Sequence, residues 1–148
     1  MRYVISAFVL VGCAISAAAA QTLERLNPAG LGTPATYSHI VKAGKTLYIA
    51  GQVGAKPDGS IAGDSMTAQL EQVLANLQTA LASQGANFSH VAKITIFVTN
   101  IAEFRAPEAM KVREKYFGTN RPASTLVQIQ QLANPAFKVE IEAVAVLP

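Results

Sequence analysis

The sequence is poor in cysteine. Its only cysteine, Cys13, lies among the first 20 of its 148 residues, in a segment that reads as an export signal. A soluble mature chain without Cys13 has neither a disulfide nor a thiol nucleophile. An oxidising compartment is therefore permitted but not required. The residues after Ala20 suffice to bury a core without cross-links.

The chain also lacks a long uninterrupted apolar run. Arg2 precedes an apolar stretch that is broken by Ser6 and Gly12 and ends in four alanines at 17–20. The stretch is marginal against the roughly 20 apolar residues that span a bilayer. A basic start, a short apolar run and a small-residue step are the parts of a secretory signal. We predict a signal peptide at 1–20, cleavage after Ala20 and export to the periplasm.

The same segment permits two other interpretations. Leu10-Val11-Gly12-Cys13 resembles a bacterial lipobox, in which the cysteine is lipidated, becomes the first mature residue and anchors the protein in a membrane. Cys13 would leave an unusually short signal, and apolar residues continue to Ala20, where a polar tether is expected. An uncleaved anchor is the third possibility. The cleaved, soluble form is the one favoured by the pattern.

An excess of charge of one sign is missing as well. Without Arg2 the chain carries 11 basic and 9 acidic side chains, a net charge near +2. This balance and the absence of a basic stripe argue against a nucleic-acid partner.

Several familiar site motifs are absent. The sequence contains no G-x-S-x-G elbow, no Walker loop and no G-x-G-x-x-G. His39 and His90 are far apart and neither has metal-ligand spacing. We therefore expect neither a cofactor nor a metal.

Hydrophobic periodicity predicts one domain at 37–148 after an extended lead-in at 21–36. Thr22–Leu26 can form a short edge strand, and Gln69 is expected to lie away from the apolar stripe of the first helix. The other expected elements are strands at 37–42, 46–50 (which Val53 can extend), 92–99, 125–129 and 137–146, and helices at 66–81 and 107–117. From Tyr37 the order is β-β-α-β-α-β-β, which predicts an α+β fold with a mixed sheet and both helices on one face.

The last strand has two different faces. Val139, Ile141, Ala143 and Ala145 are expected under the helices, and the opposite face carries Glu140, Glu142, Val144 and Val146. An exposed apolar patch of this kind, beside Phe97 on a neighbouring strand, is awkward in a monomer. Self-association through the open face is the simplest solution.

Glu140 and Glu142 are the first candidates for chemistry. They lie on one face, roughly 6.6 Å apart along the strand. A partner that buries the apolar half of this face would raise the pKa of at least one carboxylate, which suits holding or activating a water. The alternative is an exposed pair without a function.

Several stretches together resemble one family, the Rid family of YjgF-type reactive-intermediate deaminases. The likeness runs from about residue 37 to 146. It rests on Tyr37-Ser38, Ile49-Ala50-Gly51-Gln52-Val53, Gln69 with Asn76-Leu77, Phe97-Val98 and Val139-Glu140-Ile141-Glu142-Ala143-Val144-Ala145-Val146.

The resemblance implies a chorismate-mutase-like fold with a six-stranded sheet, in which Thr22–Leu26 is the first strand. It implies a homotrimer with ligand clefts between subunits. Family members hydrolyse imines and enamines released by pyridoxal-phosphate enzymes and use no metal or cofactor of their own. An arginine grips the substrate carboxylate, and a glutamate on the last strand positions water.

By position, the glutamate is Glu140 and the cleft tyrosine is Tyr37, with Gly51 bordering the site. The arginine position of Pro-Ala-Arg-Ser in active deaminases is Ser124 here. Two neighbouring positions also differ: a family serine is Ala50 and a family cysteine is Leu126.

The loss of the arginine changes what the site can bind. A guanidinium holds a carboxylate through two charge-assisted hydrogen bonds, whereas a serine hydroxyl offers one neutral donor. Arg121 lies three residues earlier, and odd spacing along a strand predicts that it points to the opposite face.

Two hypotheses follow. In the first, the chain is an exported Rid-type imine hydrolase for a small metabolite that lacks the usual carboxylate. Glu140 would position water, and Ser124 or Thr125 would donate to the ligand. In the second, it is a non-catalytic trimer that binds a ligand or acts like a chaperone. Endoribonuclease activity, sometimes attributed to the family, is disfavoured by the low charge.

Overall fold

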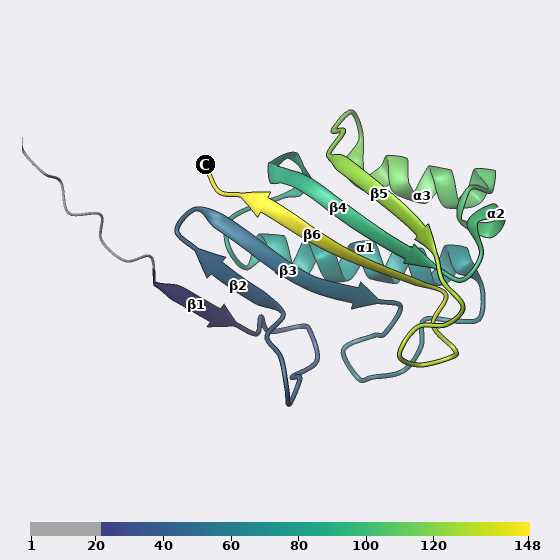
Figure 1. The fold of residues 1–148 in the computed structure, drawn as a ribbon, viewed down its shortest axis with the longest axis horizontal. Helices are drawn as coiled ribbons and strands as arrows, with labels where there is room; N and C mark the ends of the chain where they lie inside the picture. Colours follow the sequence, from purple (N-terminus) through teal and green to yellow (C-terminus); the bar gives the residue numbers. More distant parts are fainter. Residues whose placement is uncertain (1–21) are drawn as a thin grey trace, which may run out of the picture.

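The computed structural model describes residues 22–148 (Figure 1). The predicted signal at 1–20, its cleavage site and Cys13 lie outside the described residues. None of the helices between residues 22 and 148 has the length and apolarity needed to cross a bilayer.

The core of the architecture is one six-stranded mixed sheet. Its strands are β1 (Leu23–Leu26), β2 (Ile40–Ala43), β3 (Thr46–Val53), β4 (Val91–Val98), β5 (Ala123–Gln128) and β6 (Val139–Val146). They lie in the order β1-β2-β3-β6-β4-β5. Neighbours are antiparallel except β4 and β5, which are parallel. The expected first strand near Thr22–Leu26 is confirmed.

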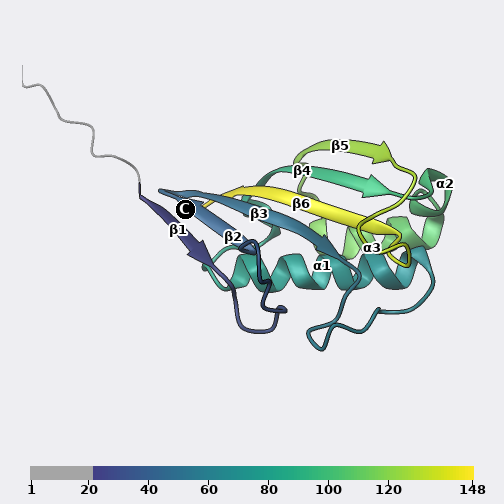
Figure 2. The same cartoon turned by 60° about the horizontal axis from the view of Figure 1, so that its bottom comes forward.

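Two long helices, α1 (Met66–Ala82) and α3 (Pro107–Phe117), pack on one face of the sheet (Figure 2). The Ser65 hydroxyl caps α1 by accepting from the backbone N–H of Ala68 at 3.1 Å. Gly118, with φ 53°, ends α3. A short α2 (Ile101–Phe104) and a 3-10 turn, η1 (Phe88–His90), complete the domain. The predicted α+β class and the helices on one face are confirmed.

The helix-facing side of the sheet forms the core. The predicted inward residues of β6 are at most 4% exposed, and they meet the apolar stripe of α1, which is at most 3% exposed: Val139, Ile141, Ala143, Ala145, Met66, Leu70, Val73, Leu74, Leu77 and Leu81. Burial of these aliphatic side chains supplies most of the driving force for folding.

The other side of the sheet, here called the open face, leaves apolar side chains uncovered in a single chain. Tyr48 is 52% exposed and Val146 is 48% exposed. Tyr48 pairs with Val144 across β3 and β6. The apolar patch expected on this face is therefore present, although Phe97 itself is partly covered.

Three strand starts differ from the predictions by two residues or more. β2 begins at Ile40 rather than Tyr37, and β6 begins at Val139 rather than Phe137, because a turn bond from the Phe137 N–H to the Asn134 carbonyl delays it. β5 begins at Ala123, two residues early, because Ala123 and Ser124 already pair with β4. Ser124 is therefore part of the strand rather than the turn before it.

Candidate functional site

The carboxylate of Glu140 lies over Gly51 on the neighbouring strand. A β-carbon placed on Gly51 would come within 2.7 Å of Glu140 Cδ and 2.8 Å of Cγ. The pairing of β3 with β6 shifts register between Ile49 and Gln52, so Gly51 belongs to a bulge. Bulges re-aim a strand locally, and a residue without a side chain leaves room for the glutamate.

Glu140 is half-buried on the open face, between Val53 of β3 and Phe97 of β4. Burial raises the pKa of the Glu140 carboxyl, and the nearby charge of Glu142 raises it further. The direction of this pKa shift is the one expected from the residue pattern of β6. A carboxylate with a raised pKa accepts a proton from water more readily than an ordinary one.

Tyr37 and Gly51 line a common hollow of about 230 Å³. The lead-in forms one wall of it, and the tyrosine ring packs edge-on against His39 with ring centroids 5.7 Å apart. Gly51 thus lies next to both this hollow and the Glu140 carboxylate, but Glu140 itself is not among the residues that line the hollow.

A buried histidine joins the lead-in to β3 behind this hollow. His39 is 7% exposed, and its Nε2 lies 2.7 Å from the Gly32 carbonyl. Its Nδ1 lies 3.3 Å from Nε2 of Gln52. The neutral tautomer with hydrogen on Nε2 satisfies both contacts, donating to Gly32 and accepting from Gln52. His39 thus has a structural role that sequence spacing did not reveal.

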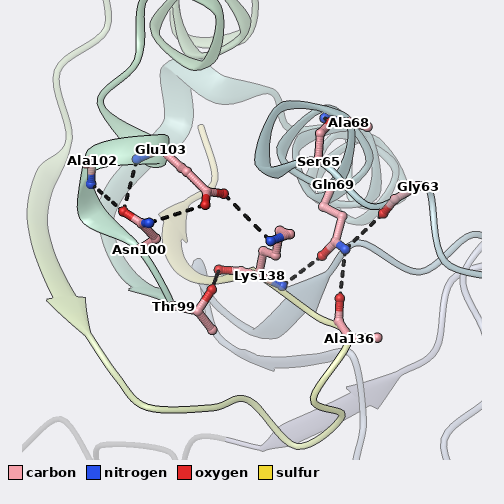
Figure 3. Close-up of polar contacts among 10 residues, drawn as sticks. All are labelled: Gly63, Ser65, Ala68, Gln69, Thr99, Asn100, Ala102, Glu103, Ala136 and Lys138. Carbon is pink, nitrogen blue, oxygen red and sulfur yellow. Dashed lines mark hydrogen bonds and ion pairs between the residues drawn. The ribbon is translucent and has the colours of Figure 1, made fainter.

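Gln69 holds the backbone of Lys138, which directly precedes β6 and lies two residues before Glu140 (Figure 3). It is fully buried, so the expectation that it lies away from the apolar stripe of α1 is wrong. Its Nε2 donates to the carbonyls of Gly63 (3.0 Å) and Ala136 (2.9 Å), and its Oε1 accepts from the Lys138 N–H at 2.8 Å. These bonds satisfy a polar side chain inside the core. The periodicity of the apolar residues had placed this polar residue away from the stripe.

Ser124 lies apart from this group. It pairs with the buried Ile94, so its side chain is on the helix side of the sheet, whereas Glu140 is on the open face. Thr125 pairs with Thr95, and Thr95 also pairs with Glu142, which places Thr125 on the open face, two strands from β6. One chain alone does not unite Ser124 with Glu140.

Arg121 lines the same pocket as Ser124, a hollow of about 230 Å³ between β5 and the end of α3. The expectation that odd spacing points Arg121 to the opposite face is therefore wrong. The two-residue alternation does not apply, because Arg121 precedes the strand. Its Nη1 donates to the carbonyls of Gly118 (2.6 Å) and Asn120 (3.0 Å), which holds it back over the helix end.

Comparison with known proteins identifies the family. Residues 28–147 match the model of the family described as Endoribonuclease L-PSP. The chain is 31% identical over 116 residues to the human 2-iminobutanoate/2-iminopropanoate deaminase, covering 78% of this chain and 82% of that protein. The chain belongs to the Rid family.

Other Rid proteins and structures agree with this assignment. The chloroplastic Reactive Intermediate Deaminase A of Arabidopsis thaliana is 36% identical over 121 residues, which are 81% of this chain and 62% of that protein. The crystal structure of RidA from an Antarctic Psychrobacter superposes with a TM-score of 0.72 at 28% identity, covering 80% and 94% of the two chains. Yeast Mmf1 gives a TM-score of 0.79 at 27% identity, covering 86% and 100%.

Proposed function

We propose that this protein hydrolyses a small imine or enamine to the corresponding carbonyl compound and ammonia. The observation that supports this most directly is the half-buried Glu140 carboxylate above Gly51, beside a hollow that Tyr37 borders. Rid relatives named as 2-iminobutanoate/2-iminopropanoate deaminases support the same reaction type.

The chemistry requires one water and one group that exchanges protons. Water adds to the imine carbon while the Glu140 carboxylate takes a proton from it, so a C–O bond forms and the C=N bond becomes single. The same carboxyl returns this proton to nitrogen, which gives a carbinolamine. The carboxylate then takes the hydroxyl proton and passes it to nitrogen as well, so that the C=O bond forms, the C–N bond breaks and ammonia leaves. A raised pKa suits both transfers, because the group takes up a proton more readily than an ordinary carboxylate and can return it.

The proposed site is completed between subunits of a homotrimer. Ser124 and Glu140 lie on opposite sides of one sheet, so a neighbouring chain has to bring a second copy of one of them. The exposed Tyr48 and Val146 make the open face the natural contact surface. Association through it would dehydrate Glu140 further and raise its pKa more.

A substrate without a carboxylate was expected for two reasons. A serine occupies the arginine position, and Arg121 was predicted to point to the opposite face of the sheet. The first stands in the sequence, and the second is not what the structure shows. We therefore keep the proposed substrate class at small imines and enamines. Pyridoxal-phosphate enzymes release such compounds mainly in the cytoplasm, so an exported, periplasmic protein would act on imines that arise outside it.

The family description names an endoribonuclease, but the charges of this chain favour imine hydrolysis over RNA cleavage. Residues 22–148 hold 11 basic and 9 acidic side chains, and Lys42, Lys115 and Lys138 are already paired with glutamates. Proteins that grip RNA present a continuous basic surface.

Release of ammonia from freshly generated 2-iminopropionate and from an amine-derived imine tests the proposal. We expect the protein to accelerate one of them and Glu140→Ala to abolish the acceleration, with Glu108→Ala on the exposed side of α3 as control. Hydrolysis of neither imine, or equal activity of Glu140→Ala, would instead favour the non-catalytic binding module.

A further inference from the structure

The bulge that carries Gly51 is held by hydrogen bonds on both sides of Ala50. Ala50 and Gly51 together lie opposite Glu142 of β6, where the register of the two strands shifts. The Ala50 N–H donates to the His39 carbonyl at 2.9 Å, and the Ala50 carbonyl accepts from Nε2 of Gln52 at 2.9 Å. The Ala50 carbonyl and the Gly51 N–H belong to one planar peptide unit, so these bonds set the orientation of Gly51.

The side chain of Gln52 is held in turn by the ring of His39. Both side chains are buried, and Nε2 of Gln52 donates to Nδ1 of His39 at 3.3 Å as well as to the Ala50 carbonyl. These two bonds use both hydrogens of the amide nitrogen. The other ring nitrogen donates to the Gly32 carbonyl at 2.7 Å. A chain of hydrogen bonds therefore runs from the lead-in through His39 and Gln52 to the bulge.

This chain of hydrogen bonds requires a neutral ring. Acidification adds a proton to an imidazole, the side chain whose charge changes between about pH 5 and pH 8. Nδ1 of His39 would then be a donor that faces the donor Nε2 of Gln52. If the Gln52 amide turned over, its Oε1 could accept from the ring but would lie against the Ala50 carbonyl, which is also an acceptor. In either arrangement one link between the ring and the bulge is lost.

The surroundings of the ring offer a protonated His39 no ion pair. Among the described residues that line the hollow, none is an aspartate or a glutamate. Lys56, on the turn after β3, is the charged side chain there, and Tyr37, which packs edge-on against the ring, is the other titratable one. The lead-in at 30–34 and Asn76 of α1 contribute uncharged groups. A second ring proton is therefore not compensated by a neighbouring carboxylate.

We propose that His39 is a positioning residue for the Glu140 carboxylate, and that it acts as the neutral ring through Gln52 and the bulge. Cγ and Cδ of Glu140 lie so close over Gly51 that a rotation of the peptide unit before Gly51 changes the surface on which the carboxylate rests. Acidification would thus loosen the position of Glu140 from the side of the lead-in. For its kinetic consequence this proposal rests on the proposed imine hydrolysis.

Two variants of His39 separate position from charge. Glutamine offers one donor and one acceptor without a charge, whereas leucine offers neither. His39→Leu should lower kcat for imine hydrolysis by about tenfold or more with little change in KM, because a reacting group is displaced while binding is kept. His39→Gln should retain most of the wild-type kcat at pH 7 and should lose less of it at pH 5 than the wild type does.

The second histidine of the described chain supplies the control for these kinetics. His90→Gln, on η1, should match the wild type in kcat and KM at both pH values. The proposal would be overturned if His39→Gln were as weak as His39→Leu, or if its kcat fell with pH as steeply as that of the wild type.

An NMR titration tests the chain of hydrogen bonds without catalysis. In Glu140→Gln, which lacks the neighbouring carboxyl, the Gly51 amide signal should shift with the same midpoint as the His39 ring signals. Adding His39→Gln should abolish this shift, and adding His90→Gln should leave it unchanged. Adding Gln52→Met removes the amide between ring and bulge and should uncouple the two signals, which distinguishes the hydrogen bonds from the direct field of a charged ring.

The outcome of this titration does not depend on the proposed reaction. A Gly51 signal that follows the His39 ring and is uncoupled by Gln52→Met would support the positioning role even if no imine is hydrolysed. A Gly51 signal that does not follow the ring, or that still shifts in His39→Gln or Gln52→Met, would overturn it even if the protein hydrolyses imines.

Discussion

The Glu140 side chain covers Gly51 so closely that a β-carbon at position 51 would meet both Cγ and Cδ of the glutamate. The contact involves the end of a flexible side chain and not the backbone. A larger residue at position 51 should therefore move the carboxylate and leave the fold in place. The role of the Glu140 carboxylate can therefore be tested by a substitution at Gly51 that leaves the sheet folded.

Gly51→Ala should lower imine hydrolysis by about tenfold to a hundredfold, because a displacement of about 1 Å in a reacting group has effects of that size. The melting temperature should change little. Adding Glu140→Asp to Gly51→Ala shortens the acid and should recover part of the activity. Unchanged activity of Gly51→Ala would contradict a catalytic position for this carboxylate.

The pH profile should report the raised pKa of Glu140. If the carboxylate takes a proton from water, kcat/KM falls as the pH drops through that pKa, which lies above the ordinary value of 4.5. Glu142→Gln removes the neighbouring charge and should move this acidic limb to lower pH. Burial is the larger cause, so the limb should remain above the ordinary value. If the acidic limb of kcat/KM does not move in Glu142→Gln, the charge of Glu142 does not act on the group that titrates.

The same pKa predicts a cost to stability. The folded protein holds the Glu140 proton more tightly than the unfolded chain, so folding gains from it below the ordinary pKa and loses this gain as pH rises through the raised one. Glu140→Gln, which stays neutral, should therefore be more stable than the wild type at pH 7. Urea unfolding at pH 4 and pH 7 checks this, and an advantage confined to pH 4 would contradict it.

Sequence patterns predicted most of the fold, but they did not predict the burial of Gln69 or the direction of Arg121. The leucine stripe of α1 and the alternation along β6 describe direct side-chain burial, so both were read correctly. The burial of Gln69 was not predicted, because a buried polar side chain depends on its hydrogen-bond partners. One of these partners, the Lys138 N–H, is 69 residues away in sequence. The direction of Arg121 was not predicted correctly, because Arg121 lies in the turn before β5, where the two-residue alternation of a strand does not apply.

Gln69→Leu should destabilise the protein by about 1–3 kcal/mol, because it leaves two carbonyls and an N–H at the edge of the core without their side-chain partner. Gln78→Leu, on the exposed side of α1, is the matched control and should stay within about 0.5 kcal/mol of the wild type. Equal urea midpoints for the two variants would show that the loop before β6 does not depend on Gln69.

Tyr48→Glu should prevent assembly through the open face. The new carboxylate would replace a ring that is 52% exposed in one chain and would be dehydrated in a trimer. Sedimentation should show a trimer for the wild type and for Lys111→Glu on α3, and a monomer for Tyr48→Glu. If Tyr48→Glu remains a trimer, the subunits associate through another face.

The placement of Ser124 and Glu140 on opposite sides of one sheet has a genetic consequence. If each cleft takes Ser124 from one chain and Glu140 from the next, two defective alleles can complement one another. In a random one-to-one mixture of Ser124→Ala and Glu140→Gln chains, about a quarter of the clefts would receive both intact halves. A cell that carries both alleles would then retain an activity that neither allele supplies alone.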